Sequence, residues 1–360
     1  MSNIVSSSDA LTPEWLTGVL REAGALEDGT TVTSAELEPV GSGVMARAQR
    51  ATLSYSQATS APASVVVKYQ TDDAGSFGVA NAMRMYETEV AFYRDVAPAT
   101  TASIPRCFAA AHDAGSGGFT LVLEDLATTT RPGDVLTMLR PDEASAVLKE
   151  LVGLQAPTWN NPELLNLPWL ADTSMTIGLF DQFPLGVDAF LERFQDKLDD
   201  EHLRLFASVL PQSGAWARSW SAPTVIQHGD FRTDNIMFGK TESDPPVTII
   251  DFQTVRLGPP GVDVAYFLGA SLSVEDRRTH DEALLREYHD GLLTAGVEDF
   301  DFDACWQSYR EGALYGVCLF VGMAGQVEST ERADRLIAEQ VSRYASMAID
   351  LESASAASLA

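Results

Sequence analysis

The chain has 360 residues, of which 45% are hydrophobic and 21% charged, so its composition is that of a folded globular protein. Lys and Arg number 24 against 51 Asp and Glu, and the net charge of −27 argues against nucleic acids and anionic membranes as partners. Three widely spaced cysteines without nearby His indicate neither a disulfide framework nor a zinc site, which fits a reducing compartment.

Residues 1–20 contain no Lys or Arg and no continuous apolar run, which excludes an ordinary secretory signal. The uncharged stretch Gly312 to Val327 is shorter than the roughly 20 residues of a membrane span and is typical of a buried helix. We therefore expect a cytoplasmic protein that binds neither nucleic acid nor membrane; the sequence leaves open whether it is a monomer or a homodimer.

The first third of the chain predicts a β-rich lobe. A helix is expected from Thr12 to Ala23, because Thr12 can cap it and Pro13 follows at the first helical position. A second helix is expected over Asn81 to Val96, where apolar residues recur on one face. Short β-type runs separated by Gly, Ser or Pro cover Val32–Val40, Ala46–Tyr55, Ser64–Tyr69 and Phe119–Leu123.

Beyond Leu126 the pattern becomes helical, interrupted by one β-type island from Thr224 to Asp251. We therefore predict an α+β fold of two lobes with a cleft: residues 1–125 form a small lobe with an antiparallel sheet and one inserted helix, and residues 126–360 form a large α-helical lobe. The predicted helices of the large lobe are Pro141–Leu154, Val187–Leu198, Leu203–Trp220, Ser273–Leu293, Phe302–Val327 and Thr330–Leu351.

Two stretches carry the residues for chemistry. In the first, a polar loop with Asp230 and Asn235 lies between two apolar strand-like groups, and in the second an apolar strand ends at Asp251. Phosphoryl transfer needs a cation held by oxygen ligands, a carboxylate for the acceptor hydroxyl and positive charge on the phosphates. Asn235 and Asp251 can supply the oxygen ligands, Asp230 the carboxylate, and Lys68, one of only four lysines, the positive charge.

These residues resemble a known family. His228-Gly229-Asp230 with Asn235 five positions after the Asp, followed by Asp251-Phe252-Gln253, is similar to the catalytic and metal-binding loops of the aminoglycoside phosphotransferase and choline kinase superfamily, which has a protein-kinase-like fold. Lys68 on the third β-run and Glu89 on the inserted helix match that superfamily in order. The amino-acid sequences of the two loops, together with Asp263-Val264-Ala265-Tyr266-Phe267-Leu268, are most similar to the ecdysteroid-kinase-like branch of that superfamily.

The resemblance implies a role for each matching residue. Asp230 is then the catalytic base or hydroxyl-orienting carboxylate, Asn235 and Asp251 ligate Mg²⁺, and Lys68 paired with Glu89 holds the ATP phosphates. Arg232 is assigned to the transferring phosphate. Backbone groups at the hinge between the lobes are assigned to adenine; these are Glu124, Asp125 and Leu126.

Several neighbouring residues have alternative readings. Glu87 competes with Glu89 for the lysine, and the match to Glu89-Val90-Ala91-Phe92-Tyr93 favours Glu89. Asp263 is expected to anchor the loop after Asp251, and Asp234 is either solvated or adjacent to the metal site. Gly41-Ser42-Gly43 is either a phosphate-covering turn that uses Gly41 and Gly43 or an ordinary hairpin.

The acceptor is expected in the helical lobe. Trp306, Tyr309 and Phe320 fall near one side of the helix predicted over Phe302–Val327 and form either an aromatic pocket face or core. Asp301 and its acidic neighbours either receive an amine or begin that helix, and the second reading is favoured. The predicted function is an ATP- and Mg²⁺-dependent kinase for a hydroxyl of a small, amine-bearing molecule such as an amino alcohol, a choline-like compound or an aminoglycoside. The alternatives are a kinase for a neutral lipid, steroid or macrolide, and a nucleotide-binding regulatory module without transfer activity.

Overall fold

The computed structural model of the chain describes residues 4–41, 43–221, 223–324 and 329–359. The chain divides into two compact units, the first made of Met1–Ala99, Ser103–Arg131 and Gly239–Thr254, and the second of Thr100–Ala102, Pro132–Phe238 and Val255–Ala360. Among the helices of the described residues, none is long and apolar enough to cross a membrane. The assignment of nucleotide binding to residues 1–125 and of acceptor binding to residues 126–360 stays a prediction.

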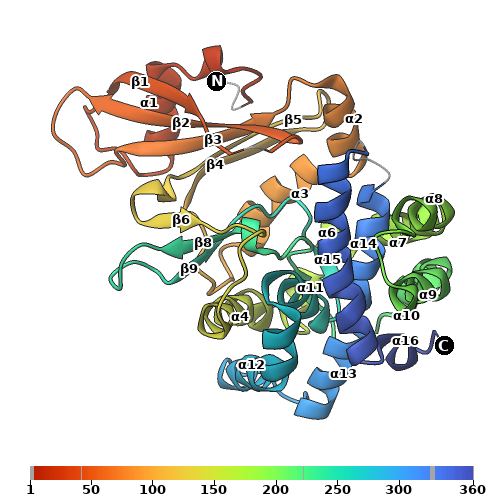
Figure 1. Ribbon diagram of the computed structural model, residues 1–360. Helices are drawn as coiled ribbons and strands as arrows, with labels where there is room; N and C mark the ends of the chain where they lie inside the picture. The colour runs from red at the N-terminus through yellow and green to blue at the C-terminus, as the bar shows by residue number, and fades with distance from the viewer. Residues whose placement is uncertain (1–3, 42, 222, 325–328, 360) are drawn as a thin grey trace. The chain divides into compact units, whose positions relative to one another are not determined.

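The first unit contains an antiparallel sheet of five strands in the order β1-β2-β3-β5-β4 (Figure 1). This confirms the predicted sheet but adds a strand, β4, which the alternation of apolar residues did not reveal because three of its residues are alanine. The strands are β1 (Val32–Pro39), β2 (Ala46–Tyr55), β3 (Ser64–Gln70), β4 (Cys107–Asp113) and β5 (Gly118–Glu124).

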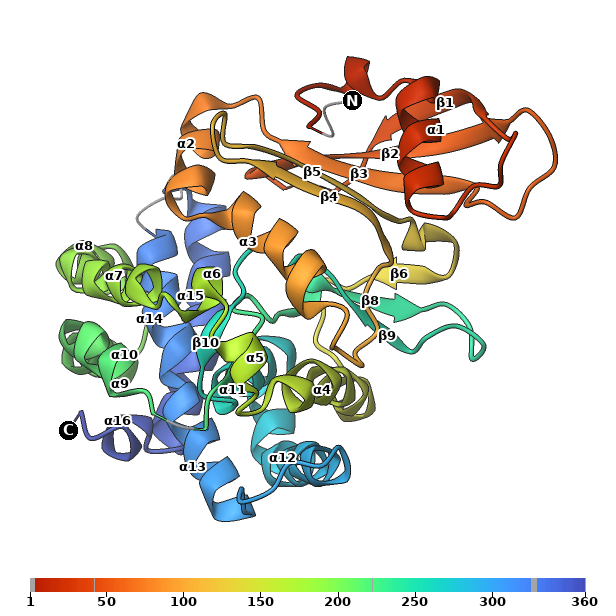
Figure 2. The same ribbon diagram turned by 180° about the vertical axis from the view of Figure 1, so that it is seen from behind.

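Helix α1 (Pro13–Glu22) contributes to the apolar core on one face of this sheet (Figure 2). Its start follows from the sequence, since the Thr12 hydroxyl accepts the N–H of Trp15 at 3.2 Å and Pro13 needs no partner for a backbone N–H. The core includes Leu16 and Leu20 of α1 and Val65 and Val67 of β3. Because strand residues alternate between faces, Lys68 lies on the opposite face from Val65 and Val67.

The single inserted helix predicted over Asn81–Val96 is wrong. Helix α2 (Ala74–Ala82) ends before Arg84, whose backbone is left-handed with φ of 55°, and α3 (Met85–Ala91) then begins in a new direction. A π-helical turn, Phe92–Val96, follows α3. Helix α3 packs against β4 and β5, and this places its buried Glu89 under the sheet within the first unit.

The second unit is built around α11 (Gly261–Ser271), whose residues are all buried and which contacts α4, α12, α13, α14 and α15 (Figure 1). Gly312 of α13 allows α11 to approach closely, since a Cβ at this position would lie 2.5 Å from the carbonyl oxygen of Gly261. The surrounding helices are α4 (Pro141–Gln155), α12 (Val274–Thr294), α13 (Phe302–Gly312), α14 (Leu314–Ala324) and α15 (Glu331–Asp350).

Two of the predicted long helices are interrupted. The helix predicted over Leu203–Trp220 is α9 (Asp200–Val209) and α10 (Ser213–Ser219), separated by a 3-10 turn that contains Pro211. The helix predicted over Phe302–Val327 is α13 and α14, separated at Ala313; residues 325–327 lie outside the described residues. The remaining helices are α5 (Pro162–Leu165), α6 (Pro168–Ala171), α7 (Ser174–Gln182), α8 (Val187–Phe194) and α16 (Ser353–Ala356).

Short strands position the polar loops. β7 (Val225–Gln227) pairs antiparallel with β10 (Arg256–Gly258) in the second unit and leads into Asp230. β9 (Val247–Ile249) lies in the first unit and leads into Asp251. The two other short strands are β6 (Thr130–Pro132) and β8 (Ile236–Gly239).

Candidate active site

Lys68 of β3 is held between two carboxylates within the first unit. Its Nζ lies 2.7 Å from Oε2 of Glu89 and 2.7 Å from Oδ1 of Asp251. Burial alone lowers the pKa of the Lys68 ammonium, but Asp251 and Glu89 outweigh it and raise that pKa above its ordinary value. Lys68 is therefore a fixed positive charge on the sheet face opposite α1.

Glu89, rather than Glu87, is the partner of Lys68. The Glu89 side chain is almost fully buried, and burial raises the pKa of its carboxyl while Lys68 opposes the rise. Glu87 instead accepts a hydrogen bond from Nε of Arg84 at 2.9 Å, at the beginning of α3. From the sequence alone we chose Glu89 over Glu87 by likeness to the family. The geometry of α3 explains this choice, because it gives the two glutamates different partners.

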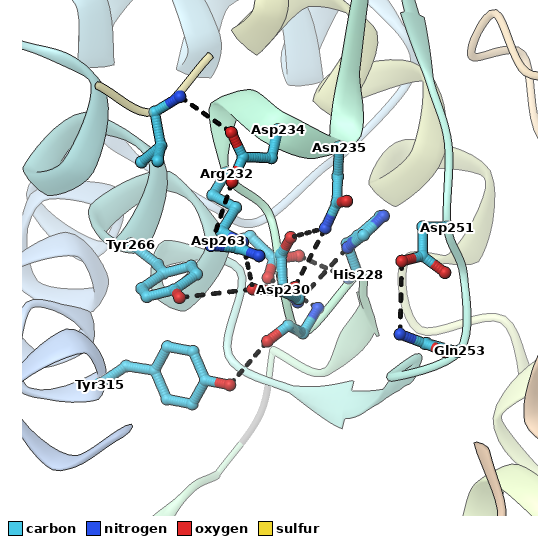
Figure 3. A network of polar contacts seen from close by, with 12 residues as sticks. His228, Asp230, Arg232, Asp234, Asn235, Asp251, Gln253, Asp263, Tyr266 and Tyr315 are labelled. Carbon is cyan, nitrogen blue, oxygen red and sulfur yellow. Dashed lines mark hydrogen bonds and ion pairs between the residues drawn. The ribbon is translucent and has the colours of Figure 1, made fainter. Parts of the chain in front are cut away.

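Asp251 adopts a left-handed backbone conformation with φ of 69°, which is uncommon for a residue with a side chain. Its other oxygen, Oδ2, lies 3.3 Å from Nε2 of Gln253 (Figure 3). The next residue, Phe252, is fully buried and stacks on Phe92 with ring centroids 3.8 Å apart. The aromatic contact fixes the loop that follows β9 and directs the Asp251 carboxylate toward Lys68.

In the second unit, the loop that follows β7 and contains Asp230 is anchored by Asp263 of α11. The backbone N–H groups of His228 and Gly229 donate to the two oxygens of Asp263, at 2.7 and 3.1 Å. Asp263 is fully buried, and burial raises the pKa of its carboxyl above the ordinary value. Our prediction that Asp263 anchors the loop after Asp251 is wrong, because its position in the first turn of α11 aims it at the loop after β7.

Asp230 receives hydrogen bonds on both carboxylate oxygens, as Figure 3 shows. Nδ2 of Asn235 lies 3.1 Å from Oδ2 of Asp230 and 2.8 Å from its backbone oxygen. Nε of Arg232 lies 3.2 Å from Oδ1, and the hydroxyl of Tyr266 lies 3.3 Å from the same atom. Gly229, with φ of 84°, provides the turn before Asp230.

Arg232 is shared between Asp230 and Asp234. Its Nη1 lies 3.2 Å from Oδ2 of Asp234, whose Oδ1 accepts the backbone N–H of Val135 at 2.8 Å. Burial lowers the pKa of Arg232, but Asp230 and the other neighbouring groups raise it above its ordinary value overall. Asp234 therefore orients Arg232 and the loop at Val135, which is a more specific role than a solvated surface carboxylate.

The hinge side chains have structural partners within the first unit. Asp125 is almost fully buried and accepts from Nε of Arg50 and Oγ of Ser64, both at 2.7 Å. Burial raises the pKa of Asp125, but these hydrogen bonds hold it below the ordinary value overall. Oε2 of Glu124 accepts the backbone N–H of Arg106 at 3.1 Å.

The remaining candidates differ in outcome. Gly41, with φ of 72°, and Gly43 lie in the connection between β1 and β2, and Ser42 lies outside the described residues. The aromatic face proposed for a single helix is wrong. Trp306 and Tyr309 belong to α13, with ring centroids 5.7 Å apart, whereas Phe320 belongs to α14 and packs against Tyr344.

Asp301 caps α13, since its Oδ1 accepts the N–H of Ala304 at 2.8 Å. This contact favours the helix-start reading of the acidic cluster. A cavity of about 410 Å³ lies in the first unit. Of the candidate site residues in the described part of the chain, only Glu124 lines this cavity. Sequence reasoning missed Arg50 and Tyr266. Arg50 lies in a predicted strand, and Tyr266 lies in the run Asp263 to Leu268, which we used only for the family resemblance.

Comparisons with known proteins identify the family of the chain. A model of the phosphotransferase enzyme family matches residues 76–300, well over half of the chain. Over 89 residues the chain is 33% identical to an uncharacterised kinase-like protein of Caenorhabditis elegans; the match covers 24% of this chain and only 23% of that relative's length.

Solved structures have a similar fold. The gentamicin complex of APH(2'')-IIa aligns with a TM-score of 0.54 at 17% identity, covering 96% of this chain and 99% of that one. A microcompartment-associated aminopropanol kinase aligns with a TM-score of 0.50 at 13% identity, again covering 96% and 99%. These likenesses confirm the predicted α+β kinase-like fold, and the family match confirms that the enzyme is a phosphotransferase. The chain therefore belongs to the phosphotransferase enzyme family.

Proposed function

We propose that this phosphotransferase is an ATP-dependent kinase that transfers the γ-phosphate to a hydroxyl group of a small molecule. The observation that carries the proposal is the position of Lys68, a partly buried ammonium group bound by Glu89 and Asp251. A cation fixed in this way supplies the positive charge that phosphoryl transfer requires on the nucleotide phosphates. ADP is bound in the solved structure of the aminoglycoside phosphotransferase APH(2'')-Ib, which shares the fold at 16% identity with a TM-score of 0.50.

The residues assigned to Mg²⁺ have suitable chemistry. The amide nitrogen of Asn235 donates to Asp230, so its amide oxygen faces away from that contact and is available to a cation. Asp251 adds a carboxylate, and Mg²⁺ prefers such oxygen ligands. No group of three or more His, Cys, Asp or Glu side chains able to hold a metal occurs among the described residues. Mg²⁺ commonly binds one or two protein ligands together with phosphates and water.

The other residues take roles in the same reaction. Asp230 orients the acceptor hydroxyl and receives its proton, and Arg232 contacts the transferring phosphate. Backbone groups of Glu124 to Leu126 bind the adenine, because the side chain of Asp125 is occupied by Arg50 and Ser64. Gly41 and Gly43 lie in the connection proposed to cover the phosphates.

For the acceptor we propose a small molecule with an amino group. The net charge of −27 favours a cationic acceptor over an anionic one. The aminopropanol kinase and the gentamicin-bound enzyme that share the fold are named for amine-bearing compounds. A neutral lipid, steroid or macrolide is the alternative, and a screen of acceptors distinguishes the two.

The test combines nucleotide binding with a transfer screen. Purified protein is titrated calorimetrically with ATP and Mg²⁺, then incubated with labelled ATP and matched panels of amino alcohols, aminoglycosides and neutral hydroxylated compounds. We expect binding and transfer to an amine-bearing acceptor, loss of transfer in Asp230→Ala, and unchanged transfer in Asp142→Asn, which alters an exposed carboxylate on α4. Nucleotide binding without transfer to any acceptor would instead indicate a regulatory module.

A further inference from the structure

The hydroxyl of Tyr266 contacts the carboxylate proposed to orient the acceptor. Tyr266 lies on α11, and its Oη is 3.3 Å from Oδ1 of Asp230 (Figure 3). The residue is 2% exposed, so water cannot readily replace this contact. Asp230 accepts a hydrogen bond from this hydroxyl. A buried Tyr hydroxyl normally has such a partner, and a hydrogen bond to an ionised carboxylate is stronger than one between neutral groups.

Tyr266 differs from the other two side chains that contact the Asp230 carboxylate. Arg232 is divided between Asp230 and Asp234, each 3.2 Å away, and Asn235 is assigned to the metal. A carboxylate rotates freely about its last side-chain bond unless donors fix both oxygens. Tyr266 on Oδ1 and Asn235 on Oδ2 meet this condition, and Tyr266 has no other assigned role.

The Tyr266 ring is itself held rigidly inside the second unit. It stacks on Tyr344, with centroids 5.4 Å apart and an angle of 6° between the planes, and meets Tyr315 edge-on at 5.1 Å. The Tyr344 hydroxyl donates to the backbone oxygen of Tyr266 at 3.1 Å. All three rings are buried, so the Tyr266 hydroxyl is a donor in a fixed position.

We propose that Tyr266 is a positioning residue for phosphoryl transfer: its hydroxyl fixes the plane of the Asp230 carboxylate, so that one oxygen faces the acceptor hydroxyl. This inference rests on the function proposed above. No bond forms or breaks at Tyr266, and its proton stays on the phenol oxygen. In this role Tyr266 acts through Asp230, so its loss slows the chemical step without weakening the binding of either substrate.

The test compares Tyr266→Phe with Tyr288→Phe. Each change removes one buried tyrosine hydroxyl from the second unit, but the Tyr266 hydroxyl donates to Asp230 whereas the Tyr288 hydroxyl donates to Gln155. We expect kcat of Tyr266→Phe to fall roughly tenfold or more, with KM for ATP and acceptor unchanged. Tyr288→Phe keeps the kcat of the unchanged enzyme. Equal kcat in Tyr266→Phe and the unchanged enzyme, or an equal fall in both variants, overturns the inference.

A structural comparison keeps the inference testable if the proposed function fails. An unchanged protein that binds ATP but transfers phosphate to no acceptor contradicts the proposed function alone. Crystal structures of that protein and of Tyr266→Phe then decide the role of Tyr266. A rotated or disordered Asp230 carboxylate in the variant supports positioning, and an Asp230 carboxylate that keeps its orientation overturns it.

Discussion

The Nζ atom of Lys68 lies 2.7 Å from Oε2 of Glu89, a carboxylate whose side chain is only 2% exposed. The contact joins β3 to α3 and places a positive charge on one face of the sheet. A buried carboxylate without a partner carries a large desolvation cost, so the stability of the first unit depends on this pair even without a ligand.

We therefore expect Lys68→Met to lower the free energy of unfolding by about 3 kcal/mol, because it leaves Glu89 buried without its cation. Adding Glu89→Gln to that variant removes the buried charge and recovers a large part of the loss. Urea unfolding of the two single variants and the double variant measures this coupling. Strictly additive losses in the double variant would show that the two residues do not stabilise each other.

The hydrogen bonds to Asp125 predict a pH-dependent contribution to stability. The pKa of Asp125 is held below its ordinary value, so its contribution is fully present above about pH 4 and is lost as the pH falls through the lowered pKa. We expect Asp125→Asn to cost about 2 kcal/mol at pH 7. The difference between the unchanged protein and the variant, measured by chemical unfolding, should stay constant from pH 8 to pH 5 and shrink below about pH 4. A cost that grows as the pH falls would contradict this account.

The sequence predicted the residues of the ion-paired cluster better than the elements that hold them. Lys68, Glu89 and Asp251 were identified from motif order, and the structure brings all three together. The break at Arg84 was not predictable, because a left-handed residue inside an apolar helical pattern has no signature unless it is Gly or Asn.

The role of Tyr266 was hidden for a different reason. It lies in the run Val264 to Leu268, which we used only for the family resemblance and in which we predicted no helix, although α11 covers it. Only the tertiary arrangement shows that its hydroxyl meets Asp230. The pairing of Arg50 with Asp125 is similarly a contact between β2 and the segment after β5, far apart in the chain.

Two helical glycines, Gly312 where α13 meets α11 and Gly18 in α1, are predicted to respond in opposite ways to substitution by Ala. Gly312→Ala brings a Cβ to 2.5 Å from the Gly261 carbonyl oxygen and should lower the melting temperature. Gly18→Ala in α1 meets no atom within 4 Å and should stabilise the protein by about 1 kcal/mol through helix propensity. Thermal unfolding of both variants measures the contrast. A Gly312→Ala protein as stable as the unchanged chain would show that the two helices can separate at no cost.

The cysteines predict low reactivity toward thiol reagents. Burial raises the pKa of Cys107 and that of Cys305 to about 12, and it raises that of Cys318 further. Since the thiolate is the reactive form, the native protein should react very slowly with a chromogenic disulfide at pH 8. The protein unfolded in guanidinium should expose three reactive thiols. Rapid reaction of the native protein at pH 8 would contradict the raised pKa values of these thiols.

The central claim is that the chain is a kinase whose transfer step depends on Asp230 and not on nucleotide binding alone. Phosphorus NMR of the protein with ATP, Mg²⁺ and its acceptor, compared between the unchanged enzyme and Asp230→Ala, tests this most directly. We predict a new phosphate-ester signal with the unchanged enzyme and none with the variant, while both bind ATP with the same affinity. An ester signal that grows at the same rate in Asp230→Ala would contradict the account.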